Sequence, residues 1–258
     1  MVETYYHLQV PCRIALLADS HDQAVPHLKE SLERNRPDVI CIAGDFVYGH
    51  PPKSGLKIRE SENAMKLLRT CVSVAWTCVS FGNHEWLLNE QDIEIIRSTG
   101  AVVLDNSWVE KNGIVFGGLT SGGMMNYRKY IKEYEIEDLY IGEFPTPRSF
   151  TPVPDIAWLG DYEKQEGIKV LLCHQPEYYT KYLQGKRIDL ILSGHAHGGQ
   201  IRIGKQGLYA PDQGLFPKLT SGVIDNCLVI SRGIAKVSRI PRINNPTEIV
   251  YIMPESGS

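Results

Sequence analysis

Imidazole, carboxylate and amide side chains recur in this chain at the points where apolar runs end. The run RIDLIL leads into SGHAHGGQ, which places His195 and His197 one residue apart among glycines. Glycine supplies the backbone freedom of a tight turn, and Asn or Asp its local hydrogen bonds, so histidine there indicates another purpose. The residues that follow other apolar runs in this way are Asp19, His21, Asp45, Asn83, His84 and His174. Such a set of donors favours a site for metal ions.

The spacing within two of these motifs predicts that each pair of donors serves one centre. In Asp19–His21 and in His195–His197 the donors stand at positions i and i+2, which on extended backbone point to the same face. A glycine directly precedes three of the expected ligands, where a missing side chain lets backbone and metal approach closely. These glycines are Gly44, Gly82 and Gly194.

Taken one at a time, the motifs have ordinary explanations. A lone buried histidine is more often a hydrogen-bonded core residue than a ligand, and Gly-Asp or Gly-Asn alone usually marks a turn. Five of the eight histidines, however, fall just after apolar runs. The motifs follow one another as Asp-x-His, Gly-Asp, Gly-Asn-His, His and Gly-His-x-His, and this order argues against coincidence.

Alternating strand and helix patterns predict how the donors are positioned. Five apolar runs have the length of buried strands that lead into loops: RIALLADSH, DVICIAGD, SVAWTCVSFGNH, KVLLCHQP and DLILSGHAH. The segments AVPHLKESLERNRP and NEQDIEIIRSTG have helical apolar spacing with Pro or Gly near the end. Three further segments resemble strands without helical crossovers: AVVLDNSWVEKNGIVFGGL, CLVISRG and EIVYIMP. We expect an α/β fold of mixed sheets with helices outside, and donors at strand carboxyl ends, where open α/β sheets bind ligands.

With these motifs in this order, the chain resembles the calcineurin-like metallophosphoesterases from about Arg13 to about Pro254. Its later part, GHAHGGQIRI followed by LVISRGIAKVSRIPRINNPTEIVYI, resembles a bacterial subgroup whose last motif is GHTHGGQ, with Ala196 in place of Thr. Some members of that subgroup are phosphodiesterases. The resemblance implies a four-layer α/β/β/α sandwich with two mixed sheets.

The resemblance also implies a dinuclear metal centre. One ion would be held by Asp19, His21, Asp45 and His197, and the other by Asp45, Asn83, His174 and His195. Asp45 would then bridge two divalent or mixed-valence ions about 3.5 to 4 Å apart. Mn, Fe and Zn all suit these donors, so the sequence leaves the metal open.

The implied reaction is hydrolysis of a phosphoester by in-line attack of a hydroxide that bridges the two metals. His84 would act as general acid or phosphate stabiliser and not as a ligand. A phosphodiester is the expected substrate, and a phosphomonoesterase is the alternative. A catalytically idle scaffold for protein binding is a third hypothesis, which the full set of donors disfavours. A structural zinc site is disfavoured because such sites are closed, usually thiolate-rich sets of four ligands.

Composition limits the remaining classes of protein. The chain has 258 residues, 43% hydrophobic and 22% charged, and we expect one metallophosphoesterase domain over residues 1–258. A net charge of −3 without a long basic run argues against nucleic acid and favours a small-molecule phosphoester. The six scattered cysteines indicate reduced thiols. Without a signal peptide or an apolar window of about 18 residues, we expect no transmembrane segment and a cytoplasmic location. The oligomeric state is not predicted.

Several segments have less specific signals. Residues 124–154, rich in Tyr and charge and then in Pro, interrupt the pattern and are expected to form an insertion or lid. Their aromatic and basic residues suit a nucleobase, a phosphate or a lipid surface, or simply a lid packed on its own core. We expect Glu85 to support the loop after His84, and His7 and His27 to lie on the surface. His50 lies on a loop that could face the substrate.

Overall fold

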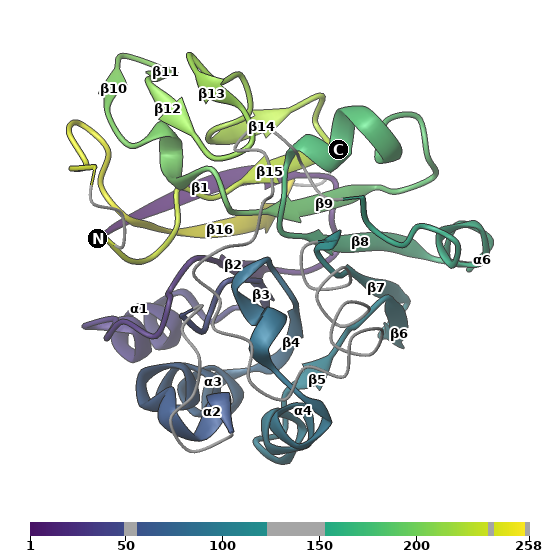
Figure 1. Ribbon diagram of the computed structural model, residues 1–258. Helices are drawn as coiled ribbons and strands as arrows, with labels where there is room; N and C mark the ends of the chain where they lie inside the picture. Colours follow the sequence, from purple (N-terminus) through teal and green to yellow (C-terminus); the bar gives the residue numbers. More distant parts are fainter. Residues whose placement is uncertain (49–55, 123–152, 237–239, 256–258) are drawn as a thin grey trace, which may run out of the picture.

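The computed structural model describes residues 1–48, 56–122, 153–236 and 240–255, and its centre is two six-stranded sheets (Figure 1). The first sheet has the order β1-β16-β2-β3-β4-β5. Strands β2 to β5 are parallel, whereas β16 runs antiparallel to β2 and parallel to β1. The strands are β1 (Val2–Leu8), β2 (Ile14–Leu17), β3 (Val39–Ala43), β4 (Trp76–Ser80), β5 (Val102–Val103) and β16 (Glu248–Pro254).

The second sheet has the order β14-β15-β9-β8-β7-β6. Strands β7, β8, β9 and β15 are parallel, and the antiparallel strands β6 and β14 form its two edges. The strands are β6 (Ser107–Lys111), β7 (Ile114–Leu119), β8 (Ile168–Cys173), β9 (Leu190–Ser193), β14 (Gly222–Ile224) and β15 (Leu228–Ile230). Both sheets are therefore mixed, as predicted from the sequence.

Alternation along the buried strands forms the layers. In β2, Ile14 and Leu16 join the apolar core between the two sheets, while Ala15 and Leu17 join the core beneath the first sheet's helices. Successive side chains of a strand point to opposite faces, so a strand that is apolar throughout must be covered on both sides. The continuous apolar run of β2 is explained by this double burial.

Helices cover the outer face of the first sheet (Figure 1). They are α1 (Leu28–Asn35), α2 (Lys57–Glu60), α3 (Glu62–Val74) and α4 (Glu90–Ser98). Helix α4 begins at a capping box in which Asn89 and Asp92 exchange side chain to backbone hydrogen bonds. On the outer face of the second sheet, α6 (Leu159–Glu163) and the π-helical turn Tyr179–Leu183 contribute apolar residues to a third core. The expected four-layer α/β/β/α sandwich is confirmed.

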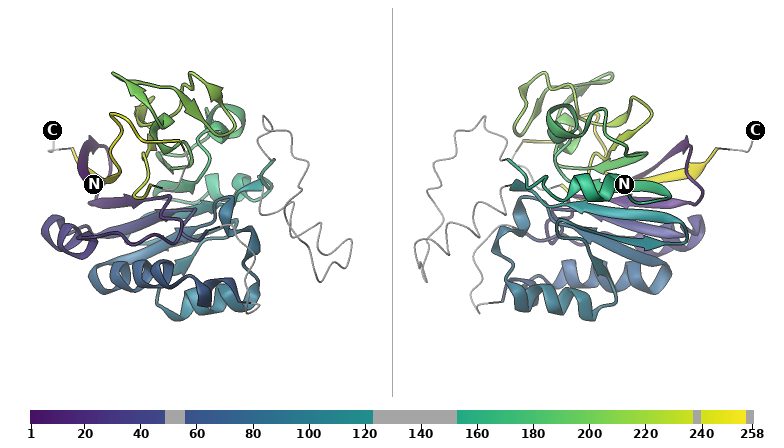
Figure 2. Two further views of the ribbon diagram at one scale, coloured as in Figure 1. Left: turned by 60° about the vertical axis from the view of Figure 1, so that its left-hand side comes forward. Right: turned by 90° about the vertical axis from the view of Figure 1, so that its right-hand side faces the viewer.

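Two short hairpins lie beyond the sheets, at the top of the left-hand view in Figure 2. They follow the 3-10 turn His197–Gly199. The first pairs β10 (Arg202–Ile203) with β11 (Gln206–Gly207), and the second pairs β12 (Tyr209–Ala210) with β13 (Gly214–Leu215). The turn of the second hairpin carries residues 211–213.

The structure also shows where the sequence patterns were incomplete. The predicted helices around Leu28–Asn35 and Glu90–Ser98 are present, but α3 was not predicted because it is separated from the apolar strand β4 by Ala75 alone. The edge strand β1 was also missed. Most of the expected insertion, residues 124–152, and His50 lie outside the described residues. The single domain over residues 1–258 stays a prediction.

The cysteines, two histidines outside the motifs and the helices bear on further expectations from the sequence. All six cysteines are free thiols, four of them buried and two half-buried. His7 and His27 are exposed, as expected. None of the helices within the described ranges is long and apolar enough to cross a membrane.

Candidate metal centre

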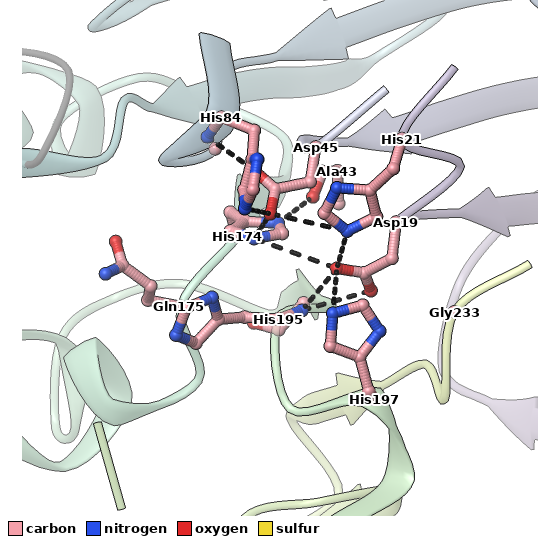
Figure 3. A network of polar contacts seen from close by, with 12 residues as sticks. Asp19, His21, Ala43, Asp45, His84, His174, Gln175, His195, His197 and Gly233 are labelled. Atoms are coloured by element: carbon pink, nitrogen blue, oxygen red, sulfur yellow. Dashed lines mark hydrogen bonds and ion pairs between the residues drawn. The ribbon is translucent and has the colours of Figure 1, made fainter. Parts of the chain in front are cut away.

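The donors singled out in the sequence come together where the carboxyl ends of the two sheets meet (Figure 3). The first sheet contributes loops that follow β2, β3 and β4, and the second sheet contributes loops that follow β8 and β9. These loops carry, in that order, Asp19 with His21, Asp45, Asn83 with His84, His174, and His195 with His197. The fold therefore joins residues that are up to 178 positions apart in the sequence.

Two carboxylates organise the cluster. Asp45 Oδ2 lies 3.0 Å from His174 Nε2 and 3.8 Å from His21 Nε2. Asp19 Oδ1 lies 3.8 Å from the Nε2 atoms of both His21 and His197. The Asp19 carboxylate also accepts the backbone N–H of His195 at 3.1 Å, which ties the first sheet to the second.

Potential ligand atoms gather in overlapping groups, each within 4.8 Å. One group comprises Asp19, His21 and His197, and another comprises Asp45, His174 and His195. These match the two halves implied by the family resemblance, apart from the shared Asp45 and the amide of Asn83. A third group adds His84 to His21 and Asp45. His84 therefore lies beside the expected ligands, and its role in catalysis stays a prediction.

The expected extended backbone at the i, i+2 pairs is wrong. Asp19, His21, His195 and His197 have positive φ angles of 59°, 45°, 64° and 47°. Their loops turn sharply as soon as the strands end, and residues in the left-handed region direct the side chains inward. The side chains therefore converge because of strained turns and not because of strand alternation.

Close approach of two loops explains the glycines before Asp45 and Asn83. A Cβ atom on Gly82 would lie 2.2 Å from Asp45 Oδ1, and one on Gly44 would lie 2.6 Å from the backbone nitrogen of Gly82. Gly44 also has a φ of 81°, which favours glycine. At these two positions glycine makes room for a ligand carboxylate and for a neighbouring loop.

The buried Glu85 carboxylate holds the loops after β3 and β4 together. Oε1 accepts N–H bonds from Phe46 and Val47, and Oε2 accepts N–H bonds from Asp45 and Gly82, at 2.7 to 3.1 Å. Each oxygen accepts two N–H bonds, which favour the ionised carboxylate, but burial and the charge of Asp45 outweigh them and raise the pKa of Glu85 to about 8. Glu85 therefore supports the loop, as expected from the sequence.

The ring of His174 is oriented by the strand beside it. Its Nδ1 lies 2.7 Å from the carbonyl oxygen of Ala43, which assigns the proton to Nδ1 and leaves Nε2 facing the cluster. A backbone carbonyl in this position is a common outer partner of metal-binding histidines, because it fixes both tautomer and ring orientation.

The electrostatics of the cluster fit bound cations. Asn83 Oδ1 and both ring nitrogens of His21 are buried and have no hydrogen-bond partner. Burial lowers the pKa of His21 to about 3 and also lowers the pKa of His197, so these two rings are neutral at neutral pH, as metal ligands must be. At His174 and His195 the neighbouring carboxylates of Asp45 and Asp212 outweigh burial and raise the pKa, to about 10 for His174. The unpartnered atoms and the carboxylates of Asp19 and Asp45 together form a nitrogen and oxygen donor set suited to Mn, Fe or Zn.

Sequence reasoning missed several residues that surround His195 and His197. Asn245 Nδ2 donates to the carbonyl of His197 at 2.8 Å, and Arg242 lies within 3.3 Å of the same carbonyl and of His197 Nδ1. Asp212 Oδ2 lies 3.2 Å from His195 Nε2. None of the three follows an apolar strand, so no pattern in the sequence pointed to them.

A two-sheet sandwich that gathers histidines and carboxylates at the carboxyl ends of its strands offers a site for metal ions. The chain belongs to the calcineurin-like phosphoesterase family, whose sequence model matches residues 12–199. Family membership implies a metal-dependent phosphoester hydrolase, and the clustered donors agree with it.

Individual relatives are distant. The chain is 27% identical to the uncharacterized protein YpbG of Bacillus subtilis, over 77% of this chain and 66% of that protein. It is 23% identical to an uncharacterized metallophosphoesterase of Aquifex aeolicus, over 90% of this chain and 78% of that protein. It is 26% identical to the phosphodiesterase YaeI of Escherichia coli, over 75% of this chain and 63% of that protein. The chain thus spans about two thirds of the length of two of these relatives.

A solved structure has a similar fold. The crystal structure of a dimetal phosphatase from Danio rerio superposes with a TM-score of 0.53 and 11% identity, covering 88% of each chain. At this identity the similarity concerns the fold alone.

Proposed function

We propose that this protein hydrolyses a phosphodiester of a small molecule at a dinuclear metal centre. The observation that carries the proposal is the convergence of two donor groups, one around Asp19 and one around Asp45. The relative YaeI of Escherichia coli is named a phosphodiesterase, which favours a diester over a monoester. A phosphomonoesterase is the second candidate, since the same donors serve both reactions.

In this proposal each ion has four ligands from the chain. Asp19, His21, Asp45 and His197 hold the first, and Asp45, Asn83, His174 and His195 hold the second. Two such ions, of Mn, Fe or Zn, would supply Lewis acidity and a water molecule that is deprotonated near neutral pH. Asp45 belongs to both sets because its carboxylate contacts histidines from both halves of the cluster.

His84 is assigned to proton transfer or phosphate stabilisation. Its side chain is 32% exposed, whereas the side chains of Asp45 and His21 are each 2% exposed. The His84 backbone N–H donates to Asp45 Oδ1 at 2.9 Å, which fixes the residue beside the centre. From there the imidazole can donate a proton to a leaving-group oxygen, a role typically worth about 10²- to 10⁴-fold in rate.

The test compares bis(p-nitrophenyl) phosphate with p-nitrophenyl phosphate after the protein is stripped of metal and reloaded with Mn²⁺. We expect a higher kcat/KM for the diester. A preference for the monoester would make the protein a phosphatase. If neither compound nor a broad panel of natural phosphoesters is hydrolysed while two ions are bound, the proposed activity is wrong.

A further inference from the structure

We propose that Asp212 is a positioning residue that holds the His195 ring with Nδ1 toward the metal centre. The inference rests on the proposed function, because it takes His195 as a metal ligand. Asp212 lies in the turn between β12 and β13, so a hairpin outside both sheets would take part in building the centre.

The contact between the two side chains limits how His195 can bind a metal. His195 Nε2 lies 3.2 Å from Asp212 Oδ2, and the His195 residue is only 5% exposed. A neutral imidazole carries its proton on one of two nitrogens. If Nε2–H donates to the Asp212 carboxylate, Nδ1 has the free lone pair that can bind a metal. Figure 3 shows a ring nitrogen of His195 directed toward His174, which is in the same group of potential ligands.

His174 provides an internal comparison. Its Nδ1 is bonded to the Ala43 carbonyl and its Nε2 faces the centre, which is the reverse of His195. The two rings meet edge to face, with centroids 5.1 Å apart. A strand carbonyl orients His174, whereas a carboxylate from a distant turn orients His195. A charged acceptor also makes the ligand ring more basic, which strengthens its bond to a metal.

Other bonds hold Asp212 in place. Gln175 Nε2 donates to Asp212 Oδ2 at 3.3 Å, and the Gln175 Oε1 atom accepts a bond from Ser121 Oγ at 2.7 Å. The next residue, Gln213, bonds through its side chain to both the N–H and the carbonyl of Leu219. Asp212 has a φ of 59°, a conformation that such bonds can maintain. The turn is therefore fixed on both sides, as a positioning residue requires.

The test measures metal affinity and not only turnover. Asp212→Asn keeps the shape of the side chain but removes its charge, and Asp212→Ala removes both. Asp225→Asn is the matched control, because Asp225 also has a positive φ, of 51°, and accepts a bond from Tyr179 at 2.8 Å. Bound Mn²⁺ is counted by elemental analysis, and the affinity of each ion is measured by competition with a chelator.

We expect Asp212→Asn to lower the affinity for one of the two Mn²⁺ ions by about 10- to 100-fold, the usual effect of losing a hydrogen-bond partner of a metal ligand. Asp212→Ala should weaken the same ion at least as much. The Tm of the metal-free Asp212→Asn protein should stay near that of the parent, and Asp225→Asn should bind both ions normally. Unchanged affinity in Asp212→Asn, or a fall in metal-free Tm without a fall in affinity, would overturn the inference.

A His195→Ala variant separates this inference from the proposed function. If His195→Ala loses one ion and Asp212→Asn does not, only the role of Asp212 is wrong. If His195→Ala keeps both ions with parental affinity, His195 is not a ligand, and both the inference and the proposed metal centre fail.

Discussion

The loops of the first sheet and the loops of the second sheet hold their donors in different ways. Around Asp45, the Glu85 carboxylate binds four backbone N–H groups, and Gly82 allows the two loops to touch. Around His195 and His197, the support comes from side chains such as Asn245 that arrive from later segments. The first half is fixed by a carboxylate from within its own loops, and the second half by side chains from distant parts of the chain.

This difference predicts how many ligands a single substitution disturbs in each half of the site. Glu85 is 40 residues or fewer from each of its partners and is bonded to the loops themselves, so its loss should disturb a whole loop. Asn245 and Asp212 each contact a single histidine or its turn, so the loss of either should disturb one ligand. Four substitutions test the comparison.

Asp45→Asn should have the largest effect because its carboxylate contacts both halves. We expect loss of both ions and a fall in kcat/KM of about a thousandfold or more, the scale seen when electrostatic stabilisation at a reacting centre is removed. Elemental analysis and the diester assay measure the two effects. Asp38→Asn is the control, because Asp38 forms an exposed ion pair with Arg13 and accepts the Arg13 backbone N–H but belongs to neither donor group. Retention of either ion at parental affinity would show that the two halves do not share Asp45.

His84→Ala should lower kcat by about 10²- to 10⁴-fold and leave both ions bound, because His84 is expected to act on the substrate. His27→Ala, at an exposed histidine away from the cluster, should change neither quantity. A potential ligand atom of His84 lies within 4.8 Å of those of His21 and Asp45. Loss of an ion in His84→Ala would therefore show that His84 is a ligand and would refute the assignment.

Glu85→Gln should destabilise the metal-free protein by about 3 kcal/mol, because an amide NH₂ would face two backbone N–H donors in a buried site. Urea unfolding of the metal-free protein measures the effect. Glu110→Gln is the control, since Glu110 caps the Gly113 N–H at an exposed turn. A loss below about 0.5 kcal/mol would mean that the Glu85 bonds do not hold the first-sheet loops.

Asn245→Ala should have the smallest effect. It removes two hydrogen bonds to the carbonyls of His197 and Gln200 and should lower the free energy of unfolding by about 1 to 2 kcal/mol. We expect weaker binding of the ion assigned to His197 and normal binding of the other. Chelator competition with the two-ion protein distinguishes them. An equal fall in the affinity for both ions would show that Asn245 does not support the second half alone.

Sequence patterns predicted that these residues lie close together, as they do in the structure, because each follows a buried strand and the carboxyl ends of parallel strands meet at one end of a sheet. Their role as metal ligands stays a prediction. They could not predict Asp212, Arg242 or Asn245, whose roles depend on contacts between distant segments. The expected extended backbone at Asp19–His21 was wrong, since local dihedral angles depend on the packed loop around them. β1 was missed because VETYYHL is a partly exposed edge strand whose partner is at the other end of the chain.

The position of β16 has a consequence for the order of folding. β16 lies between β1 and β2, with Tyr251 opposite Ala15 and Tyr5 (Figure 1). During synthesis, β2 to β4 and their helices can assemble early, but one edge of β2 stays unpaired and β1 has no sheet to join until β16 emerges. Such non-local pairing slows folding and leaves an edge open to association with other chains. We therefore expect the late pairing of β16 with β2 to govern how fast the protein folds and how readily its nascent chains aggregate.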